Sequence, residues 1–391
     1  MTSVLKGVRV VELGTMITAP LAGMMLADLG AEVIKVEHPQ GGDPFRSFRG
    51  GLYSPHFIAY NRGKRSIKLD LRNAAGQDVL RKLLARADIL LENYRAGVMD
   101  RLGFATEALR SAYPRLIHCS ITGFGADGPY SARPAYDSVG LALSGIASLL
   151  LDPEKPQAAG PTIPDNATGM FACSGILGAL YERERTGEGR RVEINMMEAA
   201  IAFIPDPFAN HTQMGIENTP LTRVASSHSF AFRCADGRLL AVHLSSQPKF
   251  WEGLLAALER TELAQDERFA TREARINNYV ALTQALAKTV GTKPRAEWMT
   301  RLETNDVPFA PVHNIPEVID DEQVKHLQTF RTLKHPTEGD IVAIRRPVRI
   351  DGGRDGSDLP APTLGQHTDE VLGELGCGAE EIAKLKAAKV I

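Results

Sequence analysis

The 391-residue sequence predicts an α/β protein with a doubly wound, Rossmann-like large domain and a smaller α+β domain. Three observations support this fold class. A strand–helix–strand unit opens the chain at residues 7–39, short apolar strands alternate with helices up to about residue 205, and a hairpin followed by helices comes next. Alternation of strands and helices is typical of a parallel sheet with crossover helices.

The elements of the large domain follow in order along the chain. Residues 7–13 are expected to form a buried strand, followed by a helix over 19–30 that has Pro20 near its start and Gly30 at its end. Residues 31–39 form a second strand that ends at a proline. Further elements are expected at 60–73 (a strand-like core), 74–87 (helix), 88–94 (strand), 97–103 (short helix), 115–124 (strand), 165–186 (helix) and 189–203 (strand, then helix).

The composition changes after residue 205. Residues 228–244 are two apolar runs joined across Asp236 and Gly237, and Asp-Gly is a strong hairpin signal. The later elements are expected at 248–260, 277–290 and 294–305 (helices), 340–350 (strand), and 368–376 and 379–390 (helices). We therefore expect a small α+β domain over 225–325, with 206–224 and 326–329 as linkers.

Composition excludes several classes of function. The formal charge of -2 gives no basic footprint for nucleic acid, and the longest nearly uncharged apolar run, 139–151, is too short to span a bilayer. The first residues lack the pattern of a secretory signal. The four cysteines are far apart and the ten histidines form no ligand pair, so we expect no metal site and a reducing, cytoplasmic location.

The first loop argues against a nucleotide cofactor. Residues 12–23 lack G-x-G-x-x-G, although Glu37 occupies the place of a ribose-binding acid. The chain also lacks a P-loop and the G-x-S-x-G elbow of serine hydrolases. NAD-dependent, ATP-dependent and serine-hydrolase chemistry are therefore disfavoured.

Two cationic segments indicate a phosphorylated ligand. The cations of residues 60–73 surround a strand-like core, and those of 92–103 come just after a predicted strand. Loops at the carboxyl ends of parallel strands are the usual ligand sites. A guanidinium pairs with phosphate through two hydrogen bonds, but a solvated charged surface explains the same pattern. The residues concerned are Arg62, Lys64, Arg65, Lys68 and Arg72 in the first segment, and Asn93, Arg95 and Arg101 in the second.

Asp165 is the only charged residue between Lys155 and Glu182, and an apolar run follows it. One interpretation is an ordinary helix N-cap. The other is a reactive carboxylate, which the helix N-terminus would hold ionised at neutral pH and which has no second acid close to it. The small residues that follow, such as Gly169 and Gly175, would let a ligand or another helix approach closely. The isolated charge alone does not decide between these interpretations.

Several ordered blocks resemble the family III CoA-transferases, the group that includes formyl-CoA, carnitine and bile-acid CoA-transferases. The blocks are 26–46, 61–71, 92–103, 120–130, 136–145 and 165–199, and the similarity continues through 234–242 and 307–318. The resemblance implies a large domain built from 1–205 plus 330–391, a small inserted domain, and an interlocked homodimer. It also implies an acyl-CoA and a small carboxylic acid as substrates, with coenzyme A as a substrate and no permanently bound cofactor.

The resemblance also assigns roles to single residues. The catalytic aspartate of the family falls on Asp165, where it would form an aspartyl anhydride and then an aspartyl-CoA thioester. The CoA-binding positions fall on Thr18, Ala19, His38, Leu71, Arg72, Asn93, Tyr94, Arg95, Arg101, Tyr136 and Asp137.

Some positions depart from the pattern of the family. Members that use oxalate carry glutamine in place of Ile17 and arginine in place of His38, and their glycine-rich lid corresponds to the glycine-free residues 243–247. These differences disfavour oxalate as the acceptor. Related acyl-CoA racemases have a His-Asp pair where this chain has Tyr136 and Asp137, and tyrosine, with a pKa near 10, is a poor base.

The alternatives to a CoA-transferase are therefore an acyl-CoA racemase or isomerase and a CoA-binding protein without turnover. Tyr136 itself has two interpretations, as a hydrogen-bond donor to the thioester or as a half-buried core aromatic.

Overall fold

The computed structural model describes residues 3–158, 160–354 and 356–391. The chain divides into two compact units, each considered by itself. Unit 1 consists of Met1–Ala147, Ala158–Pro205 and Leu327–Ile391, and unit 2 of Ser148–Gln157 and Asp206–His326.

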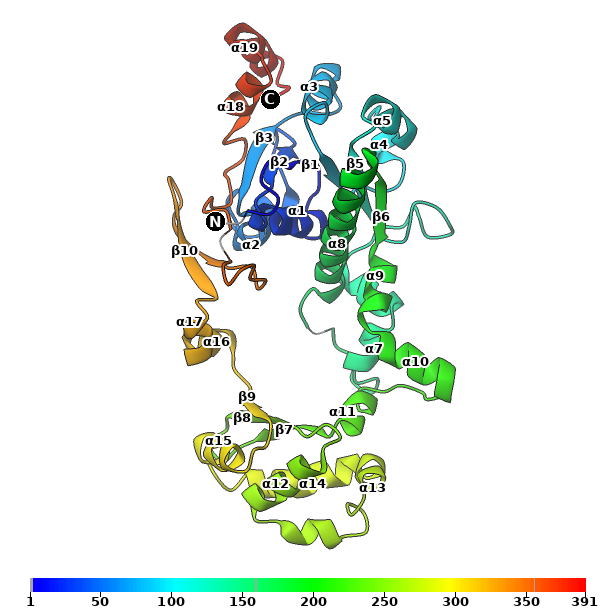
Figure 1. The fold of residues 1–391 in the computed structure, drawn as a ribbon, viewed down its shortest axis with the longest axis vertical. Coiled ribbons are helices and arrows are strands. Elements are labelled where there is room, and N and C mark those ends of the chain that lie inside the picture. The colour runs from blue at the N-terminus through cyan, green and yellow to red at the C-terminus, as the bar shows by residue number, and fades with distance from the viewer. Residues whose placement is uncertain (1–2, 159, 355) are drawn as a thin grey trace. The chain divides into compact units, whose positions relative to one another are not determined.

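A six-stranded parallel sheet forms the centre of unit 1 (Figure 1). The strand order is β3-β2-β1-β4-β5-β6, the order of a doubly wound Rossmann-like sheet. Val10 at its centre pairs with Val33 of β2 and Ile89 of β4, both in parallel. The α/β class predicted from the sequence is thus confirmed. The strands are β1 (Arg9–Glu12), β2 (Glu32–Glu37), β3 (Lys64–Lys68), β4 (Ile89–Glu92), β5 (Ile117–Thr122) and β6 (Arg191–Asn195).

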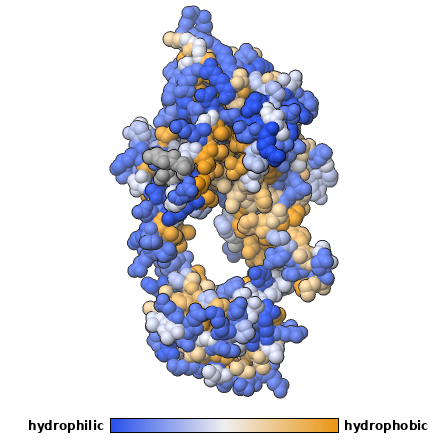
Figure 2. All heavy atoms as spheres, in the orientation of Figure 1, coloured by the Kyte–Doolittle hydropathy of each residue, from blue (hydrophilic) through white to orange (hydrophobic). Residues whose placement is uncertain are grey.

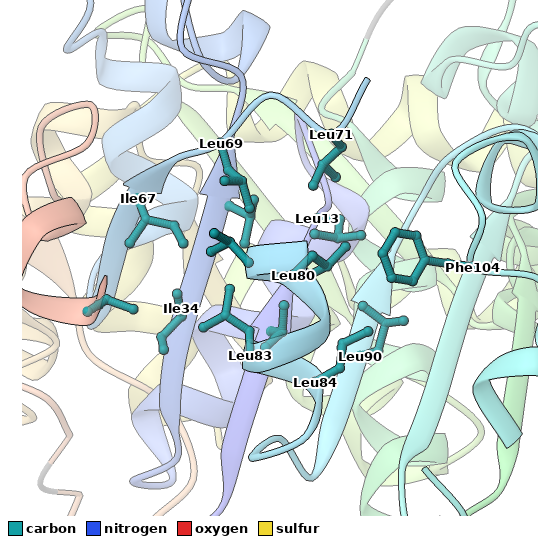
Figure 3. Packing of buried hydrophobic residues seen from close by; sticks show 14 of the residues in the cluster. Leu13, Ile34, Ile67, Leu69, Leu71, Leu80, Leu83, Leu84, Leu90 and Phe104 are labelled. Atoms are coloured by element: carbon teal, nitrogen blue, oxygen red, sulfur yellow. The ribbon is translucent and has the colours of Figure 1, made fainter. Parts of the chain in front are cut away.

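Helices cover both faces of this sheet, and successive strand residues alternate between the faces. Val11 belongs to a core with α3, α18 and α19, whereas Val10 belongs to a core with α1 and α8. Figure 3 shows the first core, with Leu80 and Leu83 of α3 packed over the strands. The helices are α1 (Thr18–Asp28), α3 (Ala74–Leu84), α8 (Ile163–Thr186), α18 (Thr368–Glu374) and α19 (Ala379–Ala387).

Residues near the end of the chain complete a loop of this sheet. The backbone N–H of Asp70, just after β3, donates to the carbonyl of Val390 at 2.8 Å. Val390 is buried in the same core as α3. The loop that contains Leu71 and Arg72 is therefore closed by a segment distant in sequence.

The remaining elements of unit 1 are short. They are η1 (Pro44–Ser47), α2 (Pro55–Asn61), α4 (Val98–Arg101), α5 (Thr106–Ala112), α6 (Asp137–Leu143), α9 (Met196–Phe203), and an antiparallel pair, β10 (Phe330–His335) and β11 (Gly339–Ile344). Among them the sequence did not indicate α2, although Ser54 caps it and Pro55 begins it.

Unit 2 has its own hydrophobic core around Trp298 and Phe269, between a three-stranded antiparallel sheet and several helices. The hairpin predicted at 228–244 is present as β7 and β8. The elements are α11 (Thr222–Ser226), β7 (Ser229–Arg233), β8 (Leu239–His243), α12 (Pro248–Leu258), η2 (Thr261–Gln265), α13 (Arg272–Asn277), α14 (Tyr279–Val290), α15 (Arg295–Thr304), β9 (Phe309–Pro311), α16 (Ile315–Asp320) and α17 (Glu322–His326).

Residues 206–224 differ from the linker expected there. They hold most of α10 (Pro205–Met214) and the start of α11, and they group with unit 2. Pro205 lies in the first turn of α10, where a missing backbone N–H has no cost, so the prolines here begin a helix. Residues 148–157, placed in the large domain by the sequence, also group with unit 2, and α7 (Ile146–Leu150) crosses that boundary.

A fully buried network of charged side chains connects the carboxyl ends of β1 and β2 with Lys64, the first residue of β3. Lys35 Nζ contacts Glu12 Oε1 at 3.1 Å and Asp43 Oδ2 at 2.9 Å, and Lys64 Nζ contacts Glu12 Oε2 at 2.8 Å. Arg46 Nε pairs with Glu37 Oε2 at 2.7 Å. Three carboxylates thus face three cations, and their charges sum to zero.

This network corrects the interpretation of the basic segment 60–73. Lys64 forms an ion pair with Glu12, and Arg62 forms one with Asp28. Arg65 forms ion pairs with Glu32, Glu370 and Glu374. These three cations form neither a phosphate site nor a solvated surface, because carboxylates from distant strands and helices neutralise them.

We predict that Glu12→Gln destabilises the protein by about 3–5 kcal/mol, because it leaves two buried ammonium groups without their shared carboxylate. Urea unfolding measures the loss in the free energy of unfolding. Glu107→Gln, at an exposed position on α5, is the matched control and should stay within about 0.5 kcal/mol of the unaltered protein. An equally small loss in both variants would contradict the role given to the network.

Candidate active site

Asp165 lies in the first turn of α8, and its side chain is half-buried. The helix begins at Ile163, two residues earlier than expected, and Thr162 occupies the N-cap position. The N-cap interpretation of Asp165 is therefore wrong: Ile163 and Pro164 are already helical, so Asp165 is the third helical residue.

A second carboxylate lies next to Asp165. The backbone N–H of Asp165 donates to Asp137 Oδ1 at 3.2 Å, and Asp137 is the first residue of α6. Burial and then the charge of Asp137 raise the pKa of Asp165 to about 7. Burial also raises the pKa of Asp137, although the hydrogen bond from Asp165 acts in the opposite direction.

The expectation of an isolated carboxylate that is fully ionised at neutral pH is thus wrong. Asp137 is 28 residues earlier in the sequence, and the fold brings it to the start of α8. The helix dipole favours an ionised group at this position, but burial and the second acid outweigh it.

Glycines allow close packing around Asp165. A Cβ added at Gly169 of α8 would lie 2.7 Å from the Thr18 carbonyl oxygen, and one at Gly140 of α6 would lie 3.0 Å from Pro164 Cβ. Such distances leave no room for a side chain. The first turn of α8 therefore packs against α6 through Pro164, and the second turn packs against the start of α1 through Gly169.

Thr18 and Ala19, both buried, begin α1 at the first loop. The side chain of Asn93 fixes this loop: its Oδ1 accepts from Thr15 N at 2.9 Å, and its Nδ2 donates to Thr15 O at 2.8 Å and to Thr18 Oγ1 at 2.9 Å. Two of the sequence-predicted segments, 18–19 and 93–95, are thus joined directly.

Glu92, a buried residue that the sequence reasoning overlooked, supports the same loop. Its Oε2 accepts from Tyr94 N at 2.8 Å, and its Oε1 lies 3.4 Å from His118 Nε2 on β5. Burial, and then the charge of Glu92, raises the pKa of Tyr94 to about 12. Arg95 and Arg101 follow as exposed cations. The sequence could have indicated Glu92, because it is an acidic residue at the end of an otherwise apolar strand.

His38 and Arg72 meet after β2 and β3. The Arg72 guanidinium contacts the His38 ring, and Arg72 N donates to Asp70 Oδ1 at 3.0 Å. Burial alone would raise the pKa of Asp70, but the hydrogen bonds and charge of Arg72 lower it. The Arg72 side chain is 72% exposed, so its guanidinium is available to a ligand.

Leu71 and Tyr136 differ in their surroundings. The Leu71 side chain belongs to the core shown in Figure 3, and its carbonyl accepts from Gln77, so the side chain does not face solvent. Tyr136 is 64% exposed immediately before α6, and its interpretation as a half-buried core aromatic is wrong.

Several of the predicted residues form two groups at one edge of the sheet, one of which also includes Asp70, which was not predicted. Loops 13–18, 38–43, 69–72 and 93–97 follow the carboxyl ends of β1, β2, β3 and β4, where doubly wound sheets bind ligands. One group joins Asp165, Asp137 and the first loop with Asn93. The other consists of His38, Asp70 and Arg72.

Comparison with known proteins identifies the family to which the chain belongs. The family model described as CoA-transferase family III matches residues 5–368. The formyl-CoA:oxalate CoA-transferase of Streptomyces avermitilis is 33% identical over 100% of both chains. The succinate–glutarate CoA-transferase of Agrobacterium fabrum is 34% identical over 95% of each.

Solved structures show the same fold. A CAIB/BAIF family protein from Brucella suis superposes with a TM-score of 0.85 at 32% identity, covering 96% of this chain and 100% of the other. Rv3272 from M. tuberculosis superposes with a TM-score of 0.83 at 32% identity, covering 93% and 97%. Across the described residues, every helix is too short or too polar to cross a membrane.

The raised pKa of Asp165 predicts a pH-dependent gain in stability for Asp165→Asn. The unfolded carboxyl ionises near its ordinary pKa and the folded one near 7, so the stability of the unaltered protein falls as pH rises between these values. Asparagine does not titrate. The free energy of unfolding of Asp165→Asn minus that of the unaltered protein should therefore increase by roughly 2 kcal/mol from pH 5 to pH 8.

Urea unfolding at several pH values tests this expectation. Asp127→Asn, in an exposed loop, is the control and should show a pH-independent difference. A flat profile for Asp165→Asn would mean that its carboxyl has an ordinary pKa.

Proposed function

The chain belongs to CoA-transferase family III and is a transferase enzyme, and we propose that it moves CoA from an acyl-CoA thioester to a free carboxylic acid with Asp165 as the covalent nucleophile. The observation that carries this proposal is the position of Asp165. Its half-buried carboxyl stands in the first turn of α8, next to Asp137, within a chain that matches the family over residues 5–368.

The chemistry requires an ionised carboxylate. Asp165 attacks the acyl carbonyl of the acyl-CoA, which forms a mixed anhydride and releases the CoA thiolate. The thiolate attacks the aspartyl carbonyl of the anhydride, giving the aspartyl-CoA thioester and the free donor acid. The carboxylate of the acceptor acid attacks this thioester, and the thiolate then takes the new acyl group and frees Asp165. Each step exchanges one acyl bond for another, so no ATP is consumed.

Asp137 is suited to tune this reaction. Burial, and then the charge of Asp137, raises the pKa of Asp165, which makes the ionised Asp165 a stronger nucleophile and lowers its ionised fraction at pH 7.

The exposed cations at the carboxyl edge support CoA binding. Arg72, Arg95 and Arg101 offer guanidinium groups for the phosphates of CoA, while His38, Tyr94 and the backbone around Leu71 line the same loops. Thr18 and Ala19 present the first turn of α1, which Asn93 fixes in place.

The two exchanged acids are proposed only as a class of small carboxylic acids. The relatives named above act on formyl-CoA and oxalate, and on succinate and glutarate. Ile17, His38 and the glycine-free residues 243–247 differ from oxalate-using members, which favours an acceptor other than oxalate.

A homodimer fits an apolar surface on unit 1. Helices α6, α8 and α9 expose large hydrophobic side chains, and Figure 2 shows apolar surface around α8 and α9. A second copy would cover this surface. The residues are Val139, Leu143, Met170, Phe171, Tyr181 and Phe203. A cytoplasmic location stays a prediction, supported by four buried, unpaired cysteines.

The alternatives are weaker. A racemase or isomerase needs a base beside the acyl carbon. Where the related racemases have a histidine, this chain has the exposed Tyr136, which is a poor base. A CoA-binding protein without turnover would not need Asp165.

We predict that Asp165→Ala lowers CoA exchange by at least about 1000-fold because the covalent route is lost. Incubation with a panel of acyl-CoAs and free acids, followed by mass spectrometry of the CoA products, measures exchange. Calorimetry should show CoA binding unchanged within a few-fold. Asp127→Asn is the control that should retain exchange. Exchange retained by Asp165→Ala would rule out the nucleophile assignment, and no exchange by the unaltered protein with any pair would favour a binding protein.

We also predict that Arg72→Met weakens CoA binding by about 10-fold, because it removes a charge-assisted bond to phosphate. The matched control is Arg110→Met at an exposed position on α5. Calorimetric titration with CoA and with dephospho-CoA tests the origin of the loss. An equal affinity of both variants for CoA would remove Arg72 from the site.

A further inference from the structure

Three polar side chains form a row across β4, β5 and β6 of the sheet in unit 1. His118 of β5 pairs in register with Arg191 of β6 and with Leu90 of β4. Glu92 comes two residues after Leu90 on β4, so its side chain lies on the same face of the sheet as those of His118 and Arg191. His118 is 6% exposed and Glu92 is 3% exposed. Two titratable groups are thus buried beside the ligand edge, and the chemistry proposed for Asp165 uses neither of them.

Arg191 determines where the His118 ring carries its hydrogen. Arg191 Nη1 lies 3.1 Å from His118 Nδ1. A guanidinium group only donates hydrogen bonds, so Nδ1 is the acceptor and the ring hydrogen is on Nε2. Arg191 is itself held in place by Glu193 Oε1, which lies 2.9 Å from its Nε, and by the hydroxyl group of Thr106. The ring therefore directs an N–H donor away from Arg191.

Glu92 is the group that faces this N–H donor. Its Oε1 lies 3.4 Å from His118 Nε2, and within the part of the chain that the structure describes Nε2 has no hydrogen bond to any other group. A buried carboxylate is unfavourable unless polar groups surround it. The His118 ring therefore favours the orientation of the Glu92 carboxylate in which Oε1 is turned toward β5.

The second oxygen of Glu92 acts on the loop that follows β4. Glu92 Oε2 accepts a hydrogen bond from Tyr94 N at 2.8 Å. Tyr94 stands between Asn93, whose side chain fixes the first loop, and Arg95, an exposed cation. The orientation of the Glu92 carboxylate therefore controls how the backbone turns at Tyr94, and with it the directions of both neighbouring side chains.

We propose that His118 is a positioning residue for CoA binding, which acts through Glu92 to hold the loop 93–97 in the conformation that receives CoA. This role rests on the proposed function, because that function assigns CoA contacts to the loop. His118 acts from inside the sheet, one strand away from β4. Asp165 is not part of the row, so the covalent steps should not depend on His118.

A purely structural role for His118 predicts a different outcome. The ring lines a cavity of about 190 Å³ together with Leu109 and Leu116, both of which are buried. In a structural role His118 would only fill space beside this cavity, and a smaller side chain would cost stability without a specific effect on CoA. The positioning role instead requires a hydrogen-bond donor at the place of Nε2.

Two amide variants distinguish these roles, because asparagine and glutamine carry their amide groups at different distances from the backbone. The amide of His118→Asn reaches the place of Nδ1. That of His118→Gln reaches the place of Nε2, where its NH2 group can donate to Glu92. We expect His118→Asn to raise the Kd for CoA about 10-fold in calorimetry, and His118→Gln to stay within about 2-fold of the unaltered protein.

Exchange kinetics provide a second readout of the same role. In His118→Asn the KM for the acyl-CoA should rise about 10-fold while kcat stays within about 2-fold, because binding is weakened and the covalent steps are not. If His118→Asn does not fold, Glu92→Gln is the second variant, with the same expectation. An amide that accepts from Tyr94 N turns its NH2 group toward His118 Nε2, where two donors would then meet.

Tyr113→Phe, at a residue that lines the same cavity, is the control and should keep the affinity for CoA. An equal loss of affinity in His118→Asn and His118→Gln, or a comparable loss in Tyr113→Phe, would reduce His118 to a structural role and overturn the proposal. CoA bound with equal affinity by the unaltered protein and by His118→Asn would overturn this role alone. No binding of CoA by the unaltered protein would overturn the proposed function together with it.

Discussion

The ion pairs among Glu12, Lys35 and Lys64 are the constraint on which the ligand-binding edge of unit 1 depends. The two lysines that converge on Glu12 also donate to the backbone of the first loop and of α1: Lys35 to the Gly14 carbonyl at 2.7 Å and Lys64 to the Pro20 carbonyl at 2.8 Å. Asp43, held by Lys35, accepts from Met16 N at 3.0 Å. Burial alone would lower the pKa of Lys35, but Asp43, Glu12 and Glu37 raise it, so this lysine stays charged. The shape of the first loop is therefore set by buried charges beneath it, and Asn93 fixes the loop from the side.

The elements that the sequence predicted best are those with a continuous apolar pattern. Strands such as 89–92 and helices such as 74–84 bury their apolar side chains wherever the rest of the chain lies, so local pattern suffices for them. The carboxyl-edge loops could also be placed, because the carboxyl ends of all strands in a parallel sheet lie at the same edge. The short helix 55–61 was missed although its proline and serine signals were present.

The errors concern pairs of charges that are distant in sequence. Lys64 and Arg72 look alike in a run of basic residues, and only the fold brings Glu12 to Lys64 while Arg72 stays exposed. Asp165 looks isolated because Asp137, at the start of α6, is 28 residues away in the sequence. A local pattern of charge contains no information about such partners, so neither the burial of Lys64 nor the raised pKa of Asp165 could be predicted. The small residues after Asp165 were informative, since the structure uses Gly169 for close contact with α1.

The hydrogen bond from Asp70 to Val390 has a consequence for biosynthesis. The ribosome makes the chain from the N-terminus, so Val390 emerges long after β3 and the loop with Arg72. Until then the nascent protein can form its parallel strands but cannot close this loop. A ribosome-bound intermediate should therefore hold the sheet with an incomplete ligand edge, and acquisition of ligand affinity would be a late event in maturation rather than a property of the growing domain.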